Sequence, residues 1–301
     1  MIRYINRANL DEGKYNDCIQ NSVQSRVYAF SWYLDIVCDE WEALVFDDYR
    51  AVMPIPWSKK YTIKYVFPPL WVLELGIFSY EEVQLNMFIS ELLKRFKFVE
   101  LRLNTDNTLY NANDYSTLQK MQWISLDKGY ENVFSKYRKD RKKDLSKAAK
   151  NRLKEVWGDT STNLITLFKN NIGKRDKNIK NKDYKNLLSL MEICQMKEVG
   201  EVLSIYDDKE HLVASAFFLL HNKTVTILVS STDLGNRKNG ANTFLIDRAI
   251  SRYEQQYTIF NFGGSSIQTV ANYFKSFGAH ESNYSFIRQN KLPALIKLFR
   301  K

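Results

Sequence analysis

The sequence predicts an α+β protein built from two units. Stretches with apolar residues at helical spacing alternate with short runs of β-branched and aromatic residues in both halves of the chain. At 301 residues the chain is long enough to bury two cores. The second half gives the order helix, strand, helices, three strands, helix, strand, helix, strand. We therefore expect each unit to be a mixed, mostly antiparallel sheet flanked by helices.

A polar stretch over 104–116, rich in Asn, Asp and Thr, is typical of a loop and separates the two units. We place the first unit at 1–118 and the second at 119–301. In the first unit, Pro54 should end the strand that begins at Arg50, because proline has no backbone N–H to donate. The patterns predict helices over 11–22 and 80–96, and strands over 41–46, 50–54, 61–67 and 98–103.

The second unit shows more regular patterns. Three strands between 201 and 230 are separated by short turns and predict an antiparallel meander. The predicted strands cover 121–126, 152–157, 201–206, 212–220, 224–230, 257–262 and 284–287. The predicted helices cover 130–152, 160–171, 183–196, 239–253 and 267–277.

Composition narrows the classes of protein. The formal net charge of +10 favours an anionic partner, such as a nucleotide, CoA, tRNA or a membrane surface. Three cysteines without a Cys-x-x-Cys pair and three scattered histidines predict neither a disulfide framework nor a metal site. The sequence has no apolar run long enough to span a bilayer and no apolar signal segment at its start. We therefore expect a cytoplasmic protein without a transmembrane segment.

The segment 257–287 carries the clearest motif. A β-rich run ends at Gly263-Gly264, because glycine enters the left-handed backbone region without strain. Ser265 or the serine after it can cap the helix that follows, and Gly278 ends that helix. The segment therefore predicts a strand, a glycine turn, a helix and a returning strand.

Phe262-Gly263-Gly264-Ser265, followed by Tyr273-Phe274-Lys275-Ser276-Phe277-Gly278-Ala279, resembles the C-terminal signature of the FemAB-like branch of the GNAT acyltransferases. Members often read Asp-Phe-Gly-Gly-Ser and then Phe-Lys-x-x-Phe-Gly-Ala, and Asn261 stands here where many have Asp. The resemblance implies two GNAT-like units, the first degenerate. It also implies an N-acyltransferase that moves an acyl group from acyl-CoA or acetyl-CoA to a primary amine of a small-molecule or cell-envelope precursor.

Two other functions stay open. The resemblance also includes enzymes of the FemABX type, which transfer an amino acid from aminoacyl-tRNA to a cell-wall peptide. The basic charge is compatible with tRNA, although the long helical arm of some such enzymes is not visible. The third possibility is a catalytically silent GNAT-like module that binds a nucleotide.

In the family, the donor pyrophosphate lies at the loop between the fourth strand and the next helix. Here that loop is 231–242, where a helix N-terminus and two cations favour an anion, although an ordinary polar loop would look similar. The residues assigned to the donor are Ser231, Arg237, Lys238, Gly240, Ala241 and Asn242.

Catalytic residues are harder to assign. Many GNAT enzymes protonate the leaving thiolate with a tyrosine four residues before the helix-ending glycine, where this chain has Phe274. Tyr273 is adjacent, so we predict that either Tyr273 serves in a shifted register or another group or a water protonates the thiolate. Asp35 is a candidate to orient the amine, with a cap role as the alternative. The general base is left open between a carboxylate and a water chain.

Substrate contacts are expected from both units. Trp32 and Tyr33 belong to an aromatic segment that predicts either an acceptor pocket or core packing. Arg141 falls inside an apolar helical stripe and needs a partner, so we predict an anion or carboxylate clamp facing the cleft between the units. The remaining predicted contacts surround the glycine turn, beside which the reacting ester should lie: Asn261, Gly263, Gly264 and Ser265.

Overall fold

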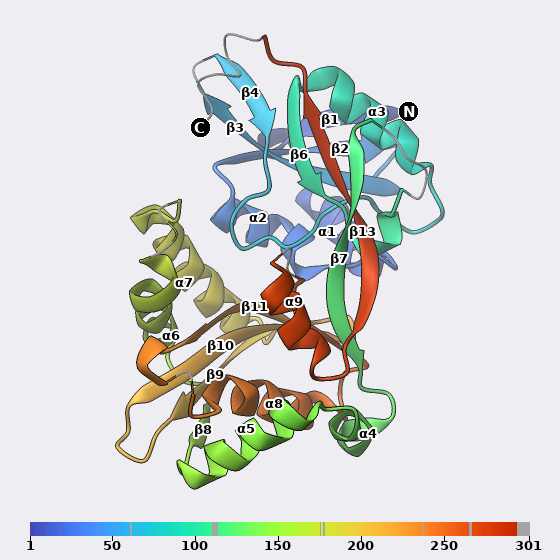
Figure 1. Ribbon diagram of the computed structural model, residues 1–301. Coiled ribbons are helices and arrows are strands. Elements are labelled where there is room, and N and C mark those ends of the chain that lie inside the picture. Colours follow the sequence, from blue (N-terminus) through green and yellow to red (C-terminus); the bar gives the residue numbers. More distant parts are fainter. Residues whose placement is uncertain are drawn as a thin grey trace. The chain divides into compact units, whose positions relative to one another are not determined.

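The computed structural model divides the chain into two compact units (Figure 1). The first is Met1–Gln119 with the strand that follows Asn283, and the second is Lys120–Ser282. The chain passes between the units in β7 (Ser116–Ser125) and again in β13 (His280–Asn290). The structure describes residues 1–60, 62–109, 114–174, 176, 178–236, 238–264 and 267–293.

The sequence placed all of 119–301 in one unit, whereas the structure returns the last described strand to the first unit. The reason is pairing, because residues 286–290 of β13 run antiparallel to β6 (Phe98–Arg102). The hydrophobic pattern of a strand does not say which neighbour it pairs with, so this return could not be read from the sequence.

The first unit contains the strand order β1-β2-β3-β4-β6-β13, with β5 paired to β3. Its strands are β1 (Ile2–Asn6), β2 (Glu40–Phe46), β3 (Ala51–Lys60), β4 (Ile63–Val66), β5 (Phe78–Ser79) and β6. Its helical segments are η1 (Arg7–Asn9), α1 (Glu12–Asn21), η2 (Val27–Ala29), α2 (Ser31–Val37), α3 (Leu85–Arg95) and η3 (Thr105–Asn107).

Pro54 and Pro56 lie inside β3, so the predicted strand end at Pro54 is wrong. A proline cannot donate a hydrogen bond, so it is tolerated where the strand needs no donor on one side. β5 pairs with β3 at Ala51 and Val52, and β4 pairs with it from Trp57 onward. Both prolines fall between these stretches, where β3 pairs with β2.

In the first unit, β4 and β6 form a parallel strand pair, matched at Val66 and Val99. Beyond it, Leu75 forms a parallel bridge with Leu103. The Leu75 N–H donates to the Arg102 carbonyl at 2.9 Å, and Leu75 is 1% exposed. The chain between β4 and β5 therefore fills the space beside the end of β6.

The second unit contains the strand order β7-β12-β11-β10-β9-β8. Its further strands are β8 (Lys154–Trp157), β9 (Gly200–Tyr206), β10 (Leu212–His221), β11 (Thr224–Thr232) and β12 (Ile259–Asn261). Its helical segments are α4 (Gly129–Ser135), α5 (Lys139–Lys150), α6 (Ser161–Phe168), the π-helical η4 (Lys169–Gly173), α7 (Asn181–Met196), η5 (Leu234–Asn236), α8 (Ala241–Tyr253) and α9 (Gln268–Lys275).

The single helix predicted over 130–152 is wrong, because the chain forms α4 and α5 with a break between them. Arg138 has an extended backbone, with ψ 150°. Its N–H donates to the Ser276 carbonyl at 2.9 Å. This bond uses a donor that a continuous helix would need for itself, so a new helix begins at Lys139.

β11 and β12 form the parallel pair of the second unit, and β11 is the longer strand. The pairing matches Thr224–Thr226 with Ile259–Asn261, and the rest of β11 runs on to Thr232. A register shift opposite Phe217 and Phe218 adds one residue, Leu228, to β11. Such a bulge bends a strand and re-aims its side chains. The described pairing of β11 with β12 ends at Thr226, while β11 stays paired with β10 up to Thr232.

Among the described residues, none of the helices combines the length and apolar character that crossing a membrane requires. Within the same residues, no three His, Cys, Asp or Glu side chains come together as a metal site would require.

Candidate active site

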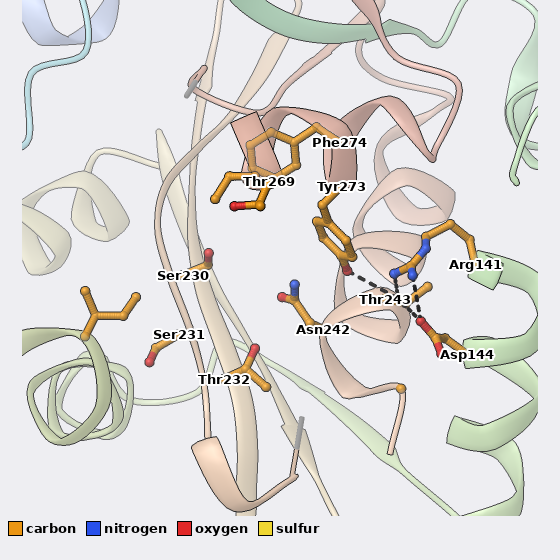
Figure 2. A pocket seen from close by; sticks show the side chains of 13 residues that line it. Arg141, Asp144, Ser230, Ser231, Thr232, Asn242, Thr243, Thr269, Tyr273 and Phe274 are labelled. Carbon is orange, nitrogen blue, oxygen red and sulfur yellow. Dashed lines mark hydrogen bonds and ion pairs between the residues drawn. The ribbon is translucent and has the colours of Figure 1, made fainter. Parts of the chain in front are cut away.

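A pocket of about 530 Å³ lies in the second unit, beside the part of β11 that extends past β12 (Figure 2). Its walls come from the end of β11, the first turn of α8, α9, α5 and η4. The described lining residues are Arg141, Asp144, Ile172, Ser230, Ser231, Thr232, Gly240, Asn242, Thr243, Thr269, Val270, Tyr273 and Phe274.

The end of β11 supplies hydroxyl groups to the pocket. Ser230, Ser231 and Thr232 follow one another there, at the end of the strand. Ser231 is 3% exposed, and its hydroxyl donates to the Leu167 carbonyl at 3.4 Å. Ser231, which was predicted to bind the acyl donor, therefore lines the pocket and also holds α6 against the strand.

The first turn of α8 forms a second wall. Gly240 has φ +88°, and a Cβ atom there would lie 2.1 Å from the Asp144 carbonyl oxygen, so only glycine lets α8 approach α5 this closely. The Ala241 N–H donates to Asn239 Oδ1 at 2.9 Å, and Asn242 faces the pocket. The helix dipole makes this end attractive to an anion.

Lys238 is exposed in the turn before α8. Arg237, which the sequence assigns to the donor phosphates, lies outside the described residues, as does Ser265.

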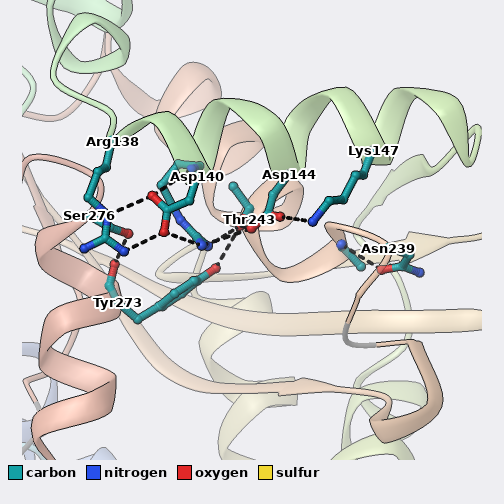
Figure 3. A network of polar contacts seen from close by, with 10 residues as sticks. Arg138, Asp140, Asp144, Lys147, Asn239, Thr243, Tyr273 and Ser276 are labelled. Atoms are coloured by element: carbon teal, nitrogen blue, oxygen red, sulfur yellow. Dashed lines mark hydrogen bonds and ion pairs between the residues drawn. The ribbon is translucent and has the colours of Figure 1, made fainter.

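A network of polar contacts joins α5, α8 and α9 at the side of the pocket (Figures 2 and 3). Arg141 Nη1 donates to Thr243 Oγ1 at 2.7 Å, and Arg141 Nη2 lies 3.0 Å from an Asp144 carboxylate oxygen. Thr243 Oγ1 is 3.2 Å from Asp144 Oδ2 and 3.2 Å from the Tyr273 hydroxyl. Lys147 pairs with the other Asp144 oxygen at 2.9 Å.

Arg141 therefore finds its partners within the second unit. Its guanidinium also contacts Asp140 at 3.2 Å and lies 4.6 Å from the centre of the Tyr273 ring. Hydrogen bonds from Arg138 and Arg141 hold the pKa of the Asp140 carboxyl well below its usual range, although partial burial opposes this. Both carboxylates that contact Arg141, Asp140 and Asp144, thus come from its own helix.

Tyr273 and Phe274 both line the pocket. The phenol therefore reaches the pocket although the tyrosine lies one residue before the position that the resemblance implies. Burial raises the pKa of the Tyr273 phenol to about 12, while the hydrogen bond with Thr243 and the Arg141 cation oppose the rise. Phe274 stacks on Phe262 with ring centres 4.6 Å apart. Tyr273 is therefore a neutral phenol at physiological pH.

The glycine turn lies between β12 and α9, and its described residues Asn261, Gly263 and Gly264 are not among those that line the pocket. Asn261 Oδ1 accepts the Gly263 N–H at 2.8 Å, which ties the end of β12 to the turn. Gly263 and Gly264 both have positive φ, 77° and 72°. These three residues, predicted to contact substrate, carry the chain from β12 toward α9.

The residues predicted in the first unit make contacts of their own. Asp35 is bound by Arg7, whose Nη2 lies 2.8 Å from a carboxylate oxygen, and it accepts the Trp41 indole N–H at 2.8 Å. Tyr33 is fully buried and donates to the Trp71 carbonyl at 2.5 Å. Trp32 is half-buried and packs against the Tyr33 ring at 5.6 Å. The contacts of Trp32 and Tyr33 match the core-packing alternative, whereas Asp35 pairs with Arg7 from inside α2 and does not cap a helix.

Asp144 and Thr243 were not singled out from the sequence. Asp144 follows Arg141 by one helical turn, a spacing that favours an ion pair. Thr243 follows Gly240 at the start of a helix. Their meeting depends on the close packing of two helices, which the sequence does not specify.

No protein-family model matches the sequence, and no curated protein matches it. Solved structures do match. FemX is 11% identical, with a TM-score of 0.64, 99% of this chain covered and 100% of that chain. The C-terminal domain (DUF2156) of a putative lysylphosphatidylglycerol synthetase from Agrobacterium fabrum is 12% identical, with a TM-score of 0.59 and coverage of 96% and 94%. A tandem GNAT protein from the clavulanic acid biosynthesis pathway is 9% identical, with a TM-score of 0.52 and coverage of 98% and 100%.

The chain has the FemAB-like GNAT fold. The predicted α+β fold of two GNAT-like units and the resemblance on which it depended are confirmed at the level of the fold. Because the identities are low, the FemAB-like GNAT fold alone does not establish the donor or the acceptor.

Proposed function

We propose that the protein is an N-acyltransferase that moves an acyl group from acyl-CoA or acetyl-CoA to a primary amine of a small-molecule or cell-envelope precursor. One observation carries the proposal. The pocket beside the free end of β11 is bounded on one side by a helix N-terminus and on another by the Tyr273 phenol. The helix N-terminus suits an anionic carrier, and the phenol can donate a proton to the leaving group of that carrier.

The donor phosphates fit at the first turn of α8. N–H groups at a helix N-terminus are without intrahelical acceptors and attract anions. Gly240 and Asn242 face the pocket there, and Lys238 is nearby in the chain. Arg237 keeps its assignment to the phosphates as part of this proposal.

Catalysis in this site requires little more than placement and proton transfer. Holding amine and thioester together replaces a bimolecular encounter, and a backbone N–H directed at the developing oxyanion lowers the barrier further. The bulged, extended end of β11 offers backbone groups beside the pocket. With its pKa raised to about 12, Tyr273 is protonated at neutral pH and suited to protonate a leaving thiolate.

Aminoacyl-tRNA is the second candidate donor. It is favoured by the net charge of +10 and by similarity to FemX over the whole chain. The cations of α5 would then contact tRNA phosphates, which dominate affinity for nucleic acids. Lys143 is exposed on that helix, and Lys142 is half-buried beside it.

Calorimetry with acetyl-CoA, aminoacyl-tRNA and uncharged tRNA tests these donors, together with transfer assays over a panel of amines. We expect acetyl-CoA to bind and Lys238→Ala to weaken it by roughly 3- to 10-fold, as expected for one phosphate contact of ~1 kcal/mol. Lys150→Ala, an exposed cation at the other end of α5, is the control.

Binding of tRNA that falls steeply with salt and is lost in Lys142→Ala/Lys143→Ala would favour the second candidate. A protein that binds acetyl-CoA but transfers no acyl group to any amine would be a silent binding module, which contradicts the proposal.

A further inference from the structure

The hydroxyl of Thr243 has three polar neighbours, and their chemistry fixes where its proton points. A threonine hydroxyl donates one hydrogen bond and accepts two. Arg141 Nη1 is only a donor, so it occupies one acceptor position, at 2.7 Å. Asp144 Oδ2 and the Tyr273 hydroxyl, both at 3.2 Å, compete for what remains.

An ionised carboxylate can only accept, and bonds to it are stronger than bonds between neutral groups. The Thr243 proton therefore points to Asp144, and the Tyr273 hydroxyl donates its own proton to Thr243. This arrangement satisfies all three contacts at once. The reverse arrangement would leave Asp144 without the threonine proton.

The directed chain runs along one wall of the pocket, because Thr243 and Asp144 line the pocket together with Tyr273. Tyr273 lines the pocket, and the Asp144 side chain is 20% exposed. Since the Tyr273 proton is used by Thr243, the phenol oxygen presents lone pairs to the pocket. Arg141 and Lys147 both face the Asp144 carboxylate, at 3.0 Å and 2.9 Å.

We propose that Tyr273, Thr243 and Asp144 form a proton relay, through which the phenol removes a proton from the acceptor amine and returns one to the leaving thiolate. The relay rests on the proposed acyl transfer and supplies the general base that the sequence left open. Tyr273 is the catalytic residue, and Thr243 and Asp144 are positioning residues that act through it.

The steps balance. As the amine nitrogen bonds to the acyl carbon, its N–H proton moves to the Tyr273 oxygen. The phenol proton passes to Thr243, and the threonine proton passes to the Asp144 carboxylate. When the C–S bond breaks, its electron pair stays on sulfur, and the three protons move back to give a thiol. The relay ends as it began, and amine plus thioester have become amide plus thiol.

Paired variants of Thr243 test the relay. Thr243→Val keeps the shape and removes the hydroxyl, so we expect kcat to fall on the order of 10²-fold, a typical loss for a broken proton transfer. Thr243→Ser restores the hydroxyl and should recover most of the rate. Asp144→Asn still accepts from Thr243 but cannot take a proton, so its kcat should fall as well. Ser146→Ala, exposed on the same helix, is the unchanged control.

Two measurements separate the relay from a structural role. Rates in mixtures of H₂O and D₂O should show several protons in flight for the wild type and fewer for Thr243→Val. With ¹³C-labelled tyrosine, the Cζ resonance of Tyr273, assigned by its loss in Tyr273→Phe, should move in Thr243→Val and stay in Thr243→Ser.

Acyl transfer that survives Thr243→Val, or a Cζ resonance that the valine leaves in place, overturns the relay and leaves the proposed function standing. A wild-type protein that transfers to no amine overturns both.

Discussion

The two units share a sheet plan and differ at one point. Among the described residues, each contains a parallel strand pair, β4 with β6 in the first unit and β11 with β12 in the second. In the first unit, Leu75 bridges to Leu103 and fills the space beyond the pair. In the second, β11 extends past β12 and a pocket of about 530 Å³ lies there. The second unit thus has a pocket at the place where a segment of the chain fills the corresponding space in the first unit.

The largest effect is expected in the pocket of the second unit. Tyr273→Phe removes the phenol and should lower kcat by about 10²- to 10⁴-fold while acetyl-CoA affinity stays the same. Tyr33→Phe in the first unit removes a buried hydroxyl bonded to Trp71 and should cost only about 1 kcal/mol of folding stability. Steady-state kinetics and urea unfolding measure the two. Equal rate losses in both variants would contradict the division of roles.

A second variant tests the space that Leu75 fills in the first unit. Leu75→Ala should lower the free energy of unfolding by about 2–5 kcal/mol, since it leaves a cavity among buried residues. The rate of acyl transfer should not change. Leu118→Ala, whose side chain is 49% exposed, is the matched control and should change stability by less than about 0.5 kcal/mol. An unaffected stability in Leu75→Ala would show that the residue is not a filler.

Gly240→Ala probes the wall between α5 and α8. The new Cβ would collide with the Asp144 carbonyl. We therefore expect Gly240→Ala to lower the free energy of unfolding by about 1–3 kcal/mol more than Gly158→Ala does. Gly158 also has positive φ, 67°, but nothing lies within 4 Å of an added Cβ. Urea unfolding of the two variants isolates the collision from the backbone strain. Equal losses would mean that the helices separate freely.

The smallest effect is expected at Asp35. Burial raises the pKa of this carboxyl, but the Arg7 and Trp41 contacts outweigh it and hold the pKa below its usual value. A depressed pKa adds stability above the unfolded pKa, and this stability disappears as the pH falls through the folded value. Asp35→Asn should therefore cost less than about 1 kcal/mol at pH 7 and nothing in strong acid.

Transfer rates should stay at the wild-type level in Asp35→Asn. A large loss of rate would restore the predicted role of Asp35 in orienting the amine.

The sequence predicted local order well, and packing between elements less well. The meander between Gly200 and Thr232 and the helix after Gly240 were predicted, because periodicity and glycine positions act locally. The break before α5 was not, because the Ser276 carbonyl that takes the Arg138 N–H is far away in the chain.

At the site, too, local features were predicted and contacts between elements were not. The loop before α8 and Tyr273 were identified from short motifs, and both reach the pocket. Asp144 and Thr243 were missed because their contact exists only when α5 and α8 pack together. Residues that act through a partner on another element leave no pattern in one sequence.

The return of β13 to the first unit has a practical consequence. A protein cut after Gln119 would lose residues 286–290, leaving β6 without the strand with which it pairs. An unpaired strand edge invites aggregation. Producing the first unit alone therefore requires the end of the chain to be grafted onto it, whereas 120–282 is continuous and can be expressed as a single segment.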